Sequence, residues 1–428
     1  MKHLLFIILV LTFCISCKSQ PIEKGKLYSS IRVKNDTTLS YAIYIPKKVN
    51  ANNLAFIFFD PSGDGPYPIS MYKNIAEKFG ITLIGNNNAK NGMDFNSILS
   101  NYSKLINELY SQYNLESKNL CLWGFSGGAK AAMYCVNNTK NINYCIYSGA
   151  YLPLQNQIEC LGFNGTKDMN YTDLLSYDYA QEKAKNNNHL QIEFSGKHAW
   201  CDTVTAVNAF RWFLLKKMLH NEIKRDNAFI AGCYTSFKKE FDKAIAAKKY
   251  RSAFLIGKKI YLCLNDLYDL SGLKSGIGAL MNNPNLNKEM KAIELNYQQE
   301  TAIKTEYQTN YTTKDTSYWS AEIAKLNQKS KTDKTGIYDR LLGYLSLASY
   351  SYANQAFSQN NVGELEKILF IYQKSDPTNP EQAFMRAKLF ILKKDLAQAK
   401  ACLQEAVQLG IDKNRINNDA VLKTVYYN

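Results

Sequence analysis

A serine inside a glycine-rich turn, Gly124–Gly128, is the first sign of a reactive site in this chain. A short apolar run precedes the turn, and a run of small residues follows it. This order predicts a strand, a sharp turn and a helix, the arrangement that exposes the serine of a G-x-S-x-G motif at the end of a sheet. Glycines flank such a serine because a bulky side chain would clash in so tight a turn. Ser126 is therefore a candidate nucleophile.

A serine hydroxyl is a poor nucleophile until a base takes its proton, and histidine is the side chain that changes charge near neutral pH. After His3 the chain has three histidines: His189 begins a predicted strand, His220 ends a predicted helix, and only His198 follows a strand in a glycine-containing loop. An aspartate can orient the imidazole and stabilise its charged form. Asp168 follows another predicted strand, so serine, acid and base occur in that order along the chain.

Predicted strands and helices alternate over residues 27–222, and the three candidate residues lie in their connections. Such alternation after an initial hairpin predicts a mostly parallel sheet with helices on both faces. Ligands of these sheets bind at the carboxyl ends of the strands, where the three candidate residues and the loop at 60–65 all lie. The predicted hairpin covers 29–33 and 39–45; further strands cover 54–59, 81–84, 119–123, 144–148, 159–164 and 190–194; helices cover 71–79, 96–113, 172–186 and 204–219.

The serine turn, Gly165–Asp168 and Gly196–Trp200 resemble the three active-site segments of the α/β-hydrolases. The resemblance is strongest to compact esterases of the dienelactone-hydrolase and polyhydroxyalkanoate-depolymerase kind, and it covers residues 27–220, under half of the chain. It implies an α/β-hydrolase fold in which the serine is the nucleophile, Asp168 the acid and His198 the base. Asp173, Asp178 and Glu159 remain alternative candidates for the acid that orients His198.

The resemblance also implies that two backbone N–H groups hold the oxyanion of the reaction. One belongs to the residue after the nucleophile, Gly127. The other belongs to the loop after the strand at 54–59, at Gly63 or Asp64, and many relatives have a histidine where this chain has Ser62. This chemistry requires no metal and no organic cofactor.

Residues 1–16 predict a targeting segment, because a short positive region precedes an apolar run that is too short to span a bilayer. Cys17 then resembles the lipidated cysteine of a bacterial lipoprotein, although Cys14 stands where leucine is usual. We therefore expect anchoring in the bacterial cell envelope, on the periplasmic or outer-membrane face, with residues 17–26 as a tether. A plain secretory signal is the alternative.

The charge and the cysteines bear on the partners and the compartment. The formal net charge is +15, but the lysines are spread along the chain and no RNA-binding signature appears, so we expect a solvated basic surface and no nucleic acid. A disulfide can form outside the cytoplasm. Cys160 and Cys201, near the expected site, are the candidate pair.

Residues 223–428 change to an almost continuous helical pattern. Small and large apolar positions of residues 379–410 recur 34 residues earlier, the period of tetratricopeptide units. The pattern fails between 270 and 335, so we interpret this half as a degenerate helical repeat domain. Such stacks often bind peptides or partner proteins, and a plain helical domain that shields the hydrolase is the alternative. The first repeat is marked by Ala353, Ala356, Leu365, Leu369 and Tyr372, and the second by Ala387, Phe390, Ala399, Leu403 and Ala406.

The sequence therefore predicts an envelope-anchored serine hydrolase, a carboxylesterase in the first place, that acts through an acyl-enzyme on a small-molecule or polymer ester. A serine peptidase of the same fold shares all of these motifs. A partner-binding lipoprotein with an inactive hydrolase domain is the alternative from another class, and the intact set of serine, aspartate and histidine argues against it.

Overall fold

The computed structural model describes residues 22–155 and 157–427. The predicted targeting segment and Cys17 lie outside the described residues. Within them, no helix is long and apolar enough to cross a membrane.

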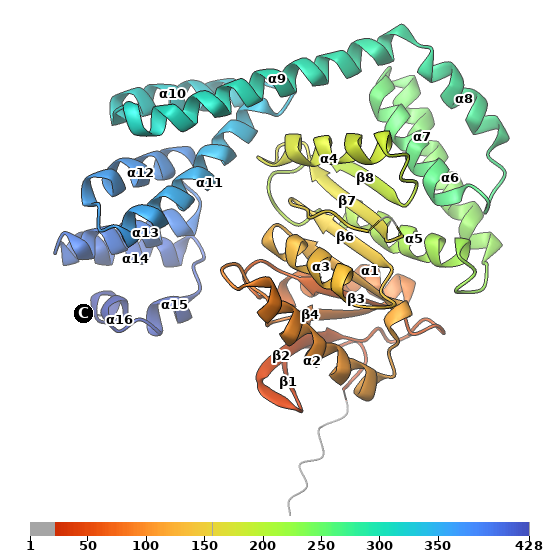
Figure 1. The fold of residues 1–428 in the computed structure, drawn as a ribbon, viewed down its shortest axis with the longest axis horizontal. Helices are drawn as coiled ribbons and strands as arrows, with labels where there is room; N and C mark the ends of the chain where they lie inside the picture. The colour runs from red at the N-terminus through yellow and green to blue at the C-terminus, as the bar shows by residue number, and fades with distance from the viewer. Residues whose placement is uncertain (1–21, 156, 428) are drawn as a thin grey trace, which may run out of the picture.

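One eight-stranded sheet organises the first half of the chain, in the order β1-β2-β4-β3-β5-β6-β7-β8 (Figure 1). β2 runs antiparallel to both of its neighbours, and the other adjacent strands run parallel. The predicted mostly parallel sheet is confirmed. The strands are β1 Leu27–Val33, β2 Asp36–Tyr44, β3 Ala55–Phe59, β4 Thr82–Asn86, β5 Leu120–Phe125, β6 Tyr144–Ser148, β7 Glu159–Gly165 and β8 His189–Phe194.

Helices cover both faces of the sheet because the central strands are apolar on both sides. Along β3, Phe56 and Phe58 belong to a core shared with α1 and α5, while Ile57 and Phe59 belong to a core shared with α2, α3 and α4. The helices are α1 Pro66–Phe79, α2 Phe95–Tyr113, α3 Gly127–Asn138, α4 Tyr171–Lys183 and α5 Thr203–Leu219, with a short 3₁₀ turn, η1, at Ser117–Asn119.

The first helix is longer than predicted. The prediction began it at residue 71, but α1 starts at Pro66. Proline is favourable at the first position of a helix, because its missing N–H would have no partner there and its φ is already close to the helical value. The stretch before residue 71 contains two prolines, which the sequence pattern alone assigns to a loop.

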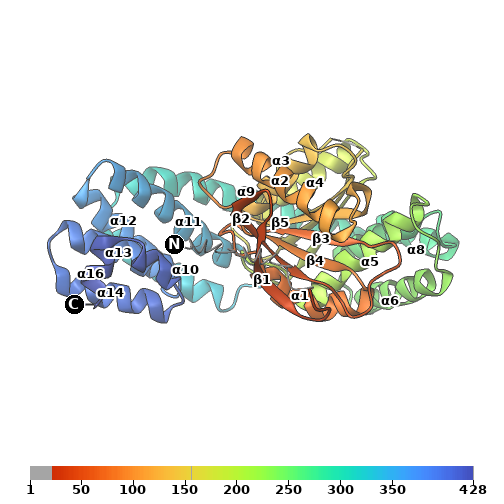
Figure 2. The same cartoon turned by 90° about the horizontal axis from the view of Figure 1, so that it is seen from below.

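The rest of the chain is helical, as predicted. α6–α8 lie beside the sheet, α9 crosses to the other side, and α11–α16 stand opposite (Figure 1), so that Figure 2 shows the two groups at opposite ends of the molecule. The helices are α6 Asn227–Ala246, α7 Tyr250–Leu264, α8 Ser271–Met281, α9 Pro284–Thr313, α10 Thr316–Ser330, α11 Ile337–Ser358, α12 Val362–Ser375, α13 Pro380–Leu392, α14 Leu396–Gln408, α15 Lys413–Asn417 and α16 Ala420–Tyr427.

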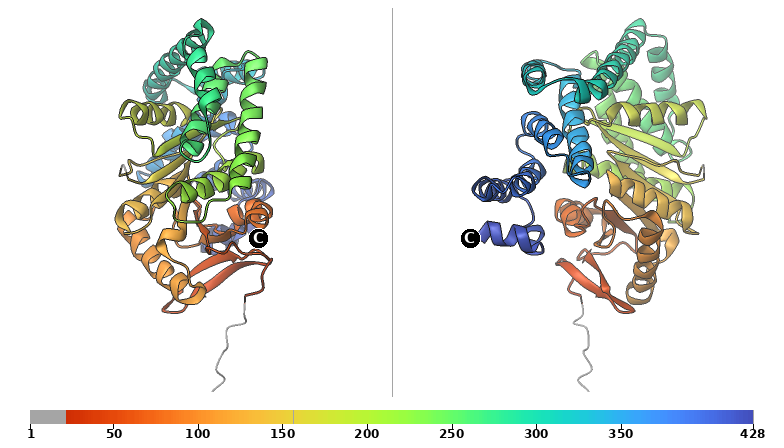
Figure 3. Two further views of the ribbon diagram at one scale, coloured as in Figure 1. Left: turned by 90° about the vertical axis from the view of Figure 1, so that its right-hand side faces the viewer. Right: turned by 60° about the vertical axis from the view of Figure 1, so that its left-hand side comes forward.

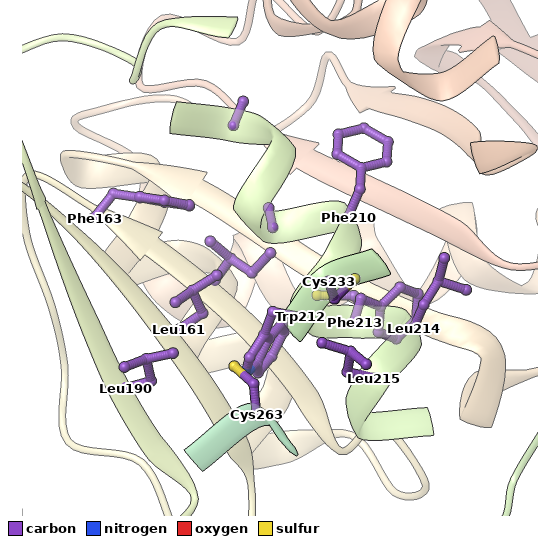
Figure 4. Packing of buried hydrophobic residues seen from close by; sticks show 14 of the residues in the cluster. Leu161, Phe163, Leu190, Phe210, Trp212, Phe213, Leu214, Leu215, Cys233 and Cys263 are labelled. Carbon is purple, nitrogen blue, oxygen red and sulfur yellow. The ribbon is translucent and has the colours of Figure 1, made fainter. Parts of the chain in front are cut away.

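The core on one face of the sheet continues beyond residue 222. Trp212 of α5 is buried in the same cluster as Cys233 of α6 and Cys263 of α7 (Figure 4). The cluster ends at Leu286, at the start of α9. α6–α8 therefore complete the core of the sheet, although they follow the predicted boundary in sequence.

α10–α16, with the end of α9, form a group that we call the helical array. Its first helices pack in one cluster with Tyr307, Trp319 and Leu341, and its later pairs pack in two more. Ala353, Ala387 and Ala399, three of the residues that mark the predicted repeats, are fully buried. Assignment of these pairs to the tetratricopeptide class stays a prediction.

Candidate active site

Ser126 lies on a sharp turn between β5 and α3. Its φ of 52° and ψ of −124° are unusual for a residue with a side chain, and such strain persists only where the surrounding structure enforces it. The Ser126 N–H donates to the carbonyl oxygen of Ser148 at 2.8 Å, which ties the turn to the end of β6.

Close packing explains two of the glycines around this serine. A Cβ on Gly124 would lie 2.3 Å from the carbonyl oxygen of Gly128, and a Cβ on Gly128 would lie 2.0 Å from that of Phe59. Both clashes are with backbone, so a side-chain rotation cannot relieve them. The same contact places the end of β3 directly against the serine turn.

His198 connects the serine to a buried carboxylate. Its Nε2 lies 2.9 Å from Ser126 Oγ, and its Nδ1 lies 2.9 Å from both carboxylate oxygens of Asp168. The Asp168 side chain is 2% exposed and the imidazole 20% exposed. The imidazole can therefore reach solvent while its partner cannot. The structure brings all three predicted residues into one hydrogen-bonded chain.

The acid sits in a closely bonded loop after β7. The Asp168 N–H donates to the carbonyl oxygen of Gly165 at 2.9 Å, and its Oδ1 also accepts from the Asn170 N–H at 2.8 Å. Asn170 Nδ2 in turn donates to the carbonyl oxygen of Gly149 at 2.7 Å. A Cβ on Gly149 would lie 3.0 Å from His198 Cε1, so a side chain there would crowd the imidazole.

Two of the alternative acids belong to other buried networks. Asp178 lies 3.2 Å from Nδ1 of His189, and Glu159 Oε1 lies 2.7 Å from Nε2 of His220. The hydrogen bond to Glu159 raises the pKa of His220. The third alternative, Asp173, lies on α4 and is exposed. Of the candidate acids, the described structure joins only Asp168 to His198.

A buried carboxylate that the sequence analysis did not single out joins two of the loops. Asp60, at the end of β3, accepts hydrogen bonds from the Ser62 N–H at 2.9 Å and from Trp200 Nε1 at 2.8 Å. Trp200 follows the base by two residues, so Asp60 fixes the loop after β3 relative to the loop that carries His198. The contact spans 140 positions in sequence, and no periodic pattern relates its two ends.

The candidate oxyanion donors lie at the start of α3 and in the loop after β3. Gly127 is the first residue of α3. The Gly63 N–H donates to the carbonyl oxygen of Asp60 at 3.0 Å, whereas the Asp64 N–H has no acceptor within the described parts of the chain. Of Gly63 and Asp64, Asp64 is therefore the residue whose N–H remains available to an oxyanion. Burial, and then the neighbouring carboxylates of Asp60 and Asp412, raise the pKa of its side chain.

The predicted disulfide is wrong. Cys160 and Cys201 are both free and buried. Cys160 belongs to the core on one face of the sheet and Cys201 to the core on the other, so the sheet separates them. Cys201 Sγ lies 3.6 Å from the hydroxyl of Tyr72, and burial raises the pKa of this thiol to about 12.

A cavity of about 1350 Å³ is lined by His198, which hydrogen-bonds to Ser126, and we call this cavity the catalytic cleft. One side consists of the loops that carry Ser62, Asp64 and His198, and the other consists of residues of α10, α11, α12, α13 and α15 with the connections beside them. Among the residues that the structure describes, no group of histidine, cysteine or carboxylate side chains is placed to hold a metal ion.

Comparison with known proteins gives likenesses of shape alone. No protein-family model and no curated protein matches the chain. The match to the Francisella virulence factor BioJ covers 45% of this chain and 86% of BioJ, with 13% sequence identity and a TM-score of 0.36. The match to a carboxylesterase from Mesorhizobium loti covers 44% of this chain and 99% of the esterase, with 15% identity and a TM-score of 0.35. A puromycin-hydrolyzing peptidase from Mycobacterium tuberculosis matches 44% of this chain and 38% of its own (11%, 0.33).

Similarities this weak carry no argument about activity, so the fold is assigned from this chain's own topology. In this chain, β2 is the antiparallel strand of an eight-stranded sheet that is otherwise mostly parallel. Ser126 lies on the turn between β5 and α3. Serine, aspartate and histidine follow β5, β7 and β8 in that order. Residues 27–219 have the α/β-hydrolase fold.

Proposed function

We propose that this protein is a serine hydrolase that cleaves carboxylic esters through an acyl-enzyme. The observation that carries the proposal is the chain of 2.9 Å contacts from Ser126 Oγ through His198 to Asp168. A nucleophile bonded to a base, which is itself oriented by a buried acid, is the geometry that nucleophilic catalysis requires.

The proposed reaction has two halves. Ser126 Oγ attacks the carbonyl carbon of the ester while His198 Nε2 takes the hydroxyl proton, and the same proton then leaves with the alcohol. Water attacks the resulting acyl-serine, gives its proton to His198, and releases the carboxylic acid with the free serine. Asp168 stabilises the imidazolium in both halves. The N–H groups of Gly127 and Asp64 are the proposed donors to the oxyanion, where a lost donor costs about 3 kcal/mol in the barrier.

Active-site labelling tests the nucleophile. A fluorophosphonate probe should label the wild-type protein, and Ser126→Ala should lose the label, because the probe forms its bond with an activated serine oxygen. Ser103→Ala, at an exposed position of α2, is the matched control and should label like the wild type. Equal labelling of all three proteins would remove Ser126 from its role.

We also propose that a lipid on Cys17 anchors the protein in the bacterial cell envelope. The support is the sequence alone, a short apolar run followed by a small residue and a cysteine. Cells grown with labelled palmitate should incorporate the label into the wild type and not into Cys17→Ser. A labelled Cys17→Ser protein would place the lipid on another residue, and an unlabelled wild type would favour plain secretion.

A further inference from the structure

The catalytic cleft is bounded by two parts of the chain that are far apart in sequence. Figure 3 shows α11–α16 as a layer beside the sheet. Gly343, Leu347 and Tyr350 of α11 line the cleft on this side, facing Asp64 and His198 on the other. A substrate that extends from His198, the hydrogen-bond partner of Ser126, into this cleft meets the helical array.

Partly buried contacts fix the helical array to the loop that carries Asp168. Arg340 Nη1 donates to the carbonyl oxygen of Thr166 at 2.7 Å, and Lys304 Nζ donates to that of Met169 at 2.9 Å. These two acceptors flank Asp168 on either side. A third contact, an ion pair of 3.0 Å, joins Lys167 to Asp339 of α11. The second wall of the cleft is thus held in place before substrate arrives.

The wall of the array combines polar groups with one small apolar platform. Leu347 and Tyr350 lie one helical turn apart on α11, and both line the cleft with side chains that stay 42% and 40% exposed. Hydrogen-bonding groups surround them. The carboxylates are Asp339, Asp376, Glu381 and Asp412; the amides are Asn327 and Asn379; the hydroxyls are Ser330, Ser346, Tyr372, Ser375 and Thr378. The guanidinium of Arg415 also lines this wall and pairs with Glu381.

This lining and this size select one class of substrate. At about 1350 Å³ the cleft exceeds the 300–1,000 Å³ typical of small-ligand sites. A carbohydrate chain has sugar rings with an apolar C–H face and many hydroxyls, which match an exposed aromatic ring among carboxylates, amides and hydroxyls. A long acyl chain would need a continuous apolar lining, which these polar residues interrupt. Peptides usually bind at a sheet edge or in an apolar helix groove, and β1 and β8, the edge strands, do not line this cleft.

We propose that the helical array binds a carbohydrate chain, and that the substrate is an ester carried on an oligosaccharide. The inference rests on the proposed esterase function and names its substrate class. Tyr350 is the proposed platform for a sugar ring, two or more units from the ester. The array then determines substrate length and polarity, while the loops of the sheet determine the chemistry.

Chain length in the substrate provides the test. For the full-length protein, kcat/KM should be about tenfold higher for an acetylated xylopentaose than for acetylated xylose, because the longer chain reaches the array. Tyr350→Ala should remove most of this ratio through KM, and Tyr350→Phe should keep it because the ring remains. Tyr427→Ala, an exposed tyrosine of α16 outside the cleft, is the matched control and should keep the wild-type ratio.

The other outcomes separate this inference from the function on which it rests. Hydrolysis of p-nitrophenyl acetate without any gain from chain length overturns the carbohydrate assignment and leaves the esterase intact. Preference for p-nitrophenyl palmitate, or for a peptide p-nitroanilide, overturns it in favour of a lipid or a peptide. If no ester is cleaved and Ser126 is not labelled, both proposals fall together.

Discussion

Replacing Asp168 by asparagine is expected to lower kcat for ester hydrolysis by about 10⁴-fold, while the protein stays folded. Both oxygens of this carboxylate lie 2.9 Å from His198 Nδ1, so they hold the tautomer whose Nε2 can accept the serine proton. An asparagine can offer its amide N–H to the same nitrogen and so stabilise the opposite tautomer. It also removes the negative charge that stabilises the imidazolium.

The comparison is best made with chromogenic ester hydrolysis and with the rate of fluorophosphonate labelling. Asp173→Asn, an exposed carboxylate on α4, is the matched control and should keep wild-type rates. Combining Asp168→Asn with Ser126→Ala should cost no more than Ser126→Ala alone, because the residues act as one unit. If Asp173→Asn loses most of its hydrolysis rate and Asp168→Asn keeps it, Asp173 and not Asp168 is the acid.

Replacing Arg340 by methionine is expected to destabilise the helical array by up to about 3–5 kcal/mol, because it leaves the buried carboxylate of Glu300 with Lys304 as its remaining ion-pair partner. Arg340 and Glu300 are both fully buried, and the guanidinium Nε and Nη2 each lie 2.7 Å from Glu300 Oε2. The same guanidinium donates to the carbonyl oxygen of Thr335 and stacks 4.8 Å from the ring centre of Tyr171. Urea unfolding followed by tryptophan fluorescence measures the loss.

A double replacement separates stability from activity. Glu300→Leu together with Arg340→Met removes both buried charges, and such pairs often regain most of the stability that the single change loses. The double variant still lacks the contact with Thr166, so we expect a stable protein with a lower kcat. Wild-type kcat in this variant would show that the contact does not position the acid loop. An Arg340→Met protein as stable as the wild type would contradict the expected cost of the buried carboxylate.

The strands, and the positions of the candidate catalytic residues at their ends, could be predicted because local sequence determines them. Ala55–Phe59 is an apolar run buried on both faces, and Ser126, Asp168 and His198 each follow the end of a strand. In a parallel sheet, the ends of the strands meet at one edge whatever the lengths of the connections. Sequence order and periodicity were therefore enough to bring these residues together.

What could not be predicted depends on contacts between distant residues. The bond from Trp200 to Asp60 and the bond from Arg340 to Thr166 join segments that no periodic pattern relates. The predicted pairing of Cys160 failed for a related reason, since sequence spacing does not say which face of a sheet a buried cysteine occupies. The catalytic cleft likewise depends on where α9 places the helical array relative to the sheet, and the sequence of α9 does not specify this position.

The continuity of the core from α5 into α6–α8 has a consequence for synthesis on the ribosome. Domains generally fold as units while the chain is made from its N-terminus. Here the core on the α5 side of the sheet, which contains Trp212, includes buried residues as late as Leu286. The catalytic loops are thus translated well before their supporting core is complete. We therefore expect this core to be complete only after about two thirds of the chain has emerged, at 286 of 428 residues.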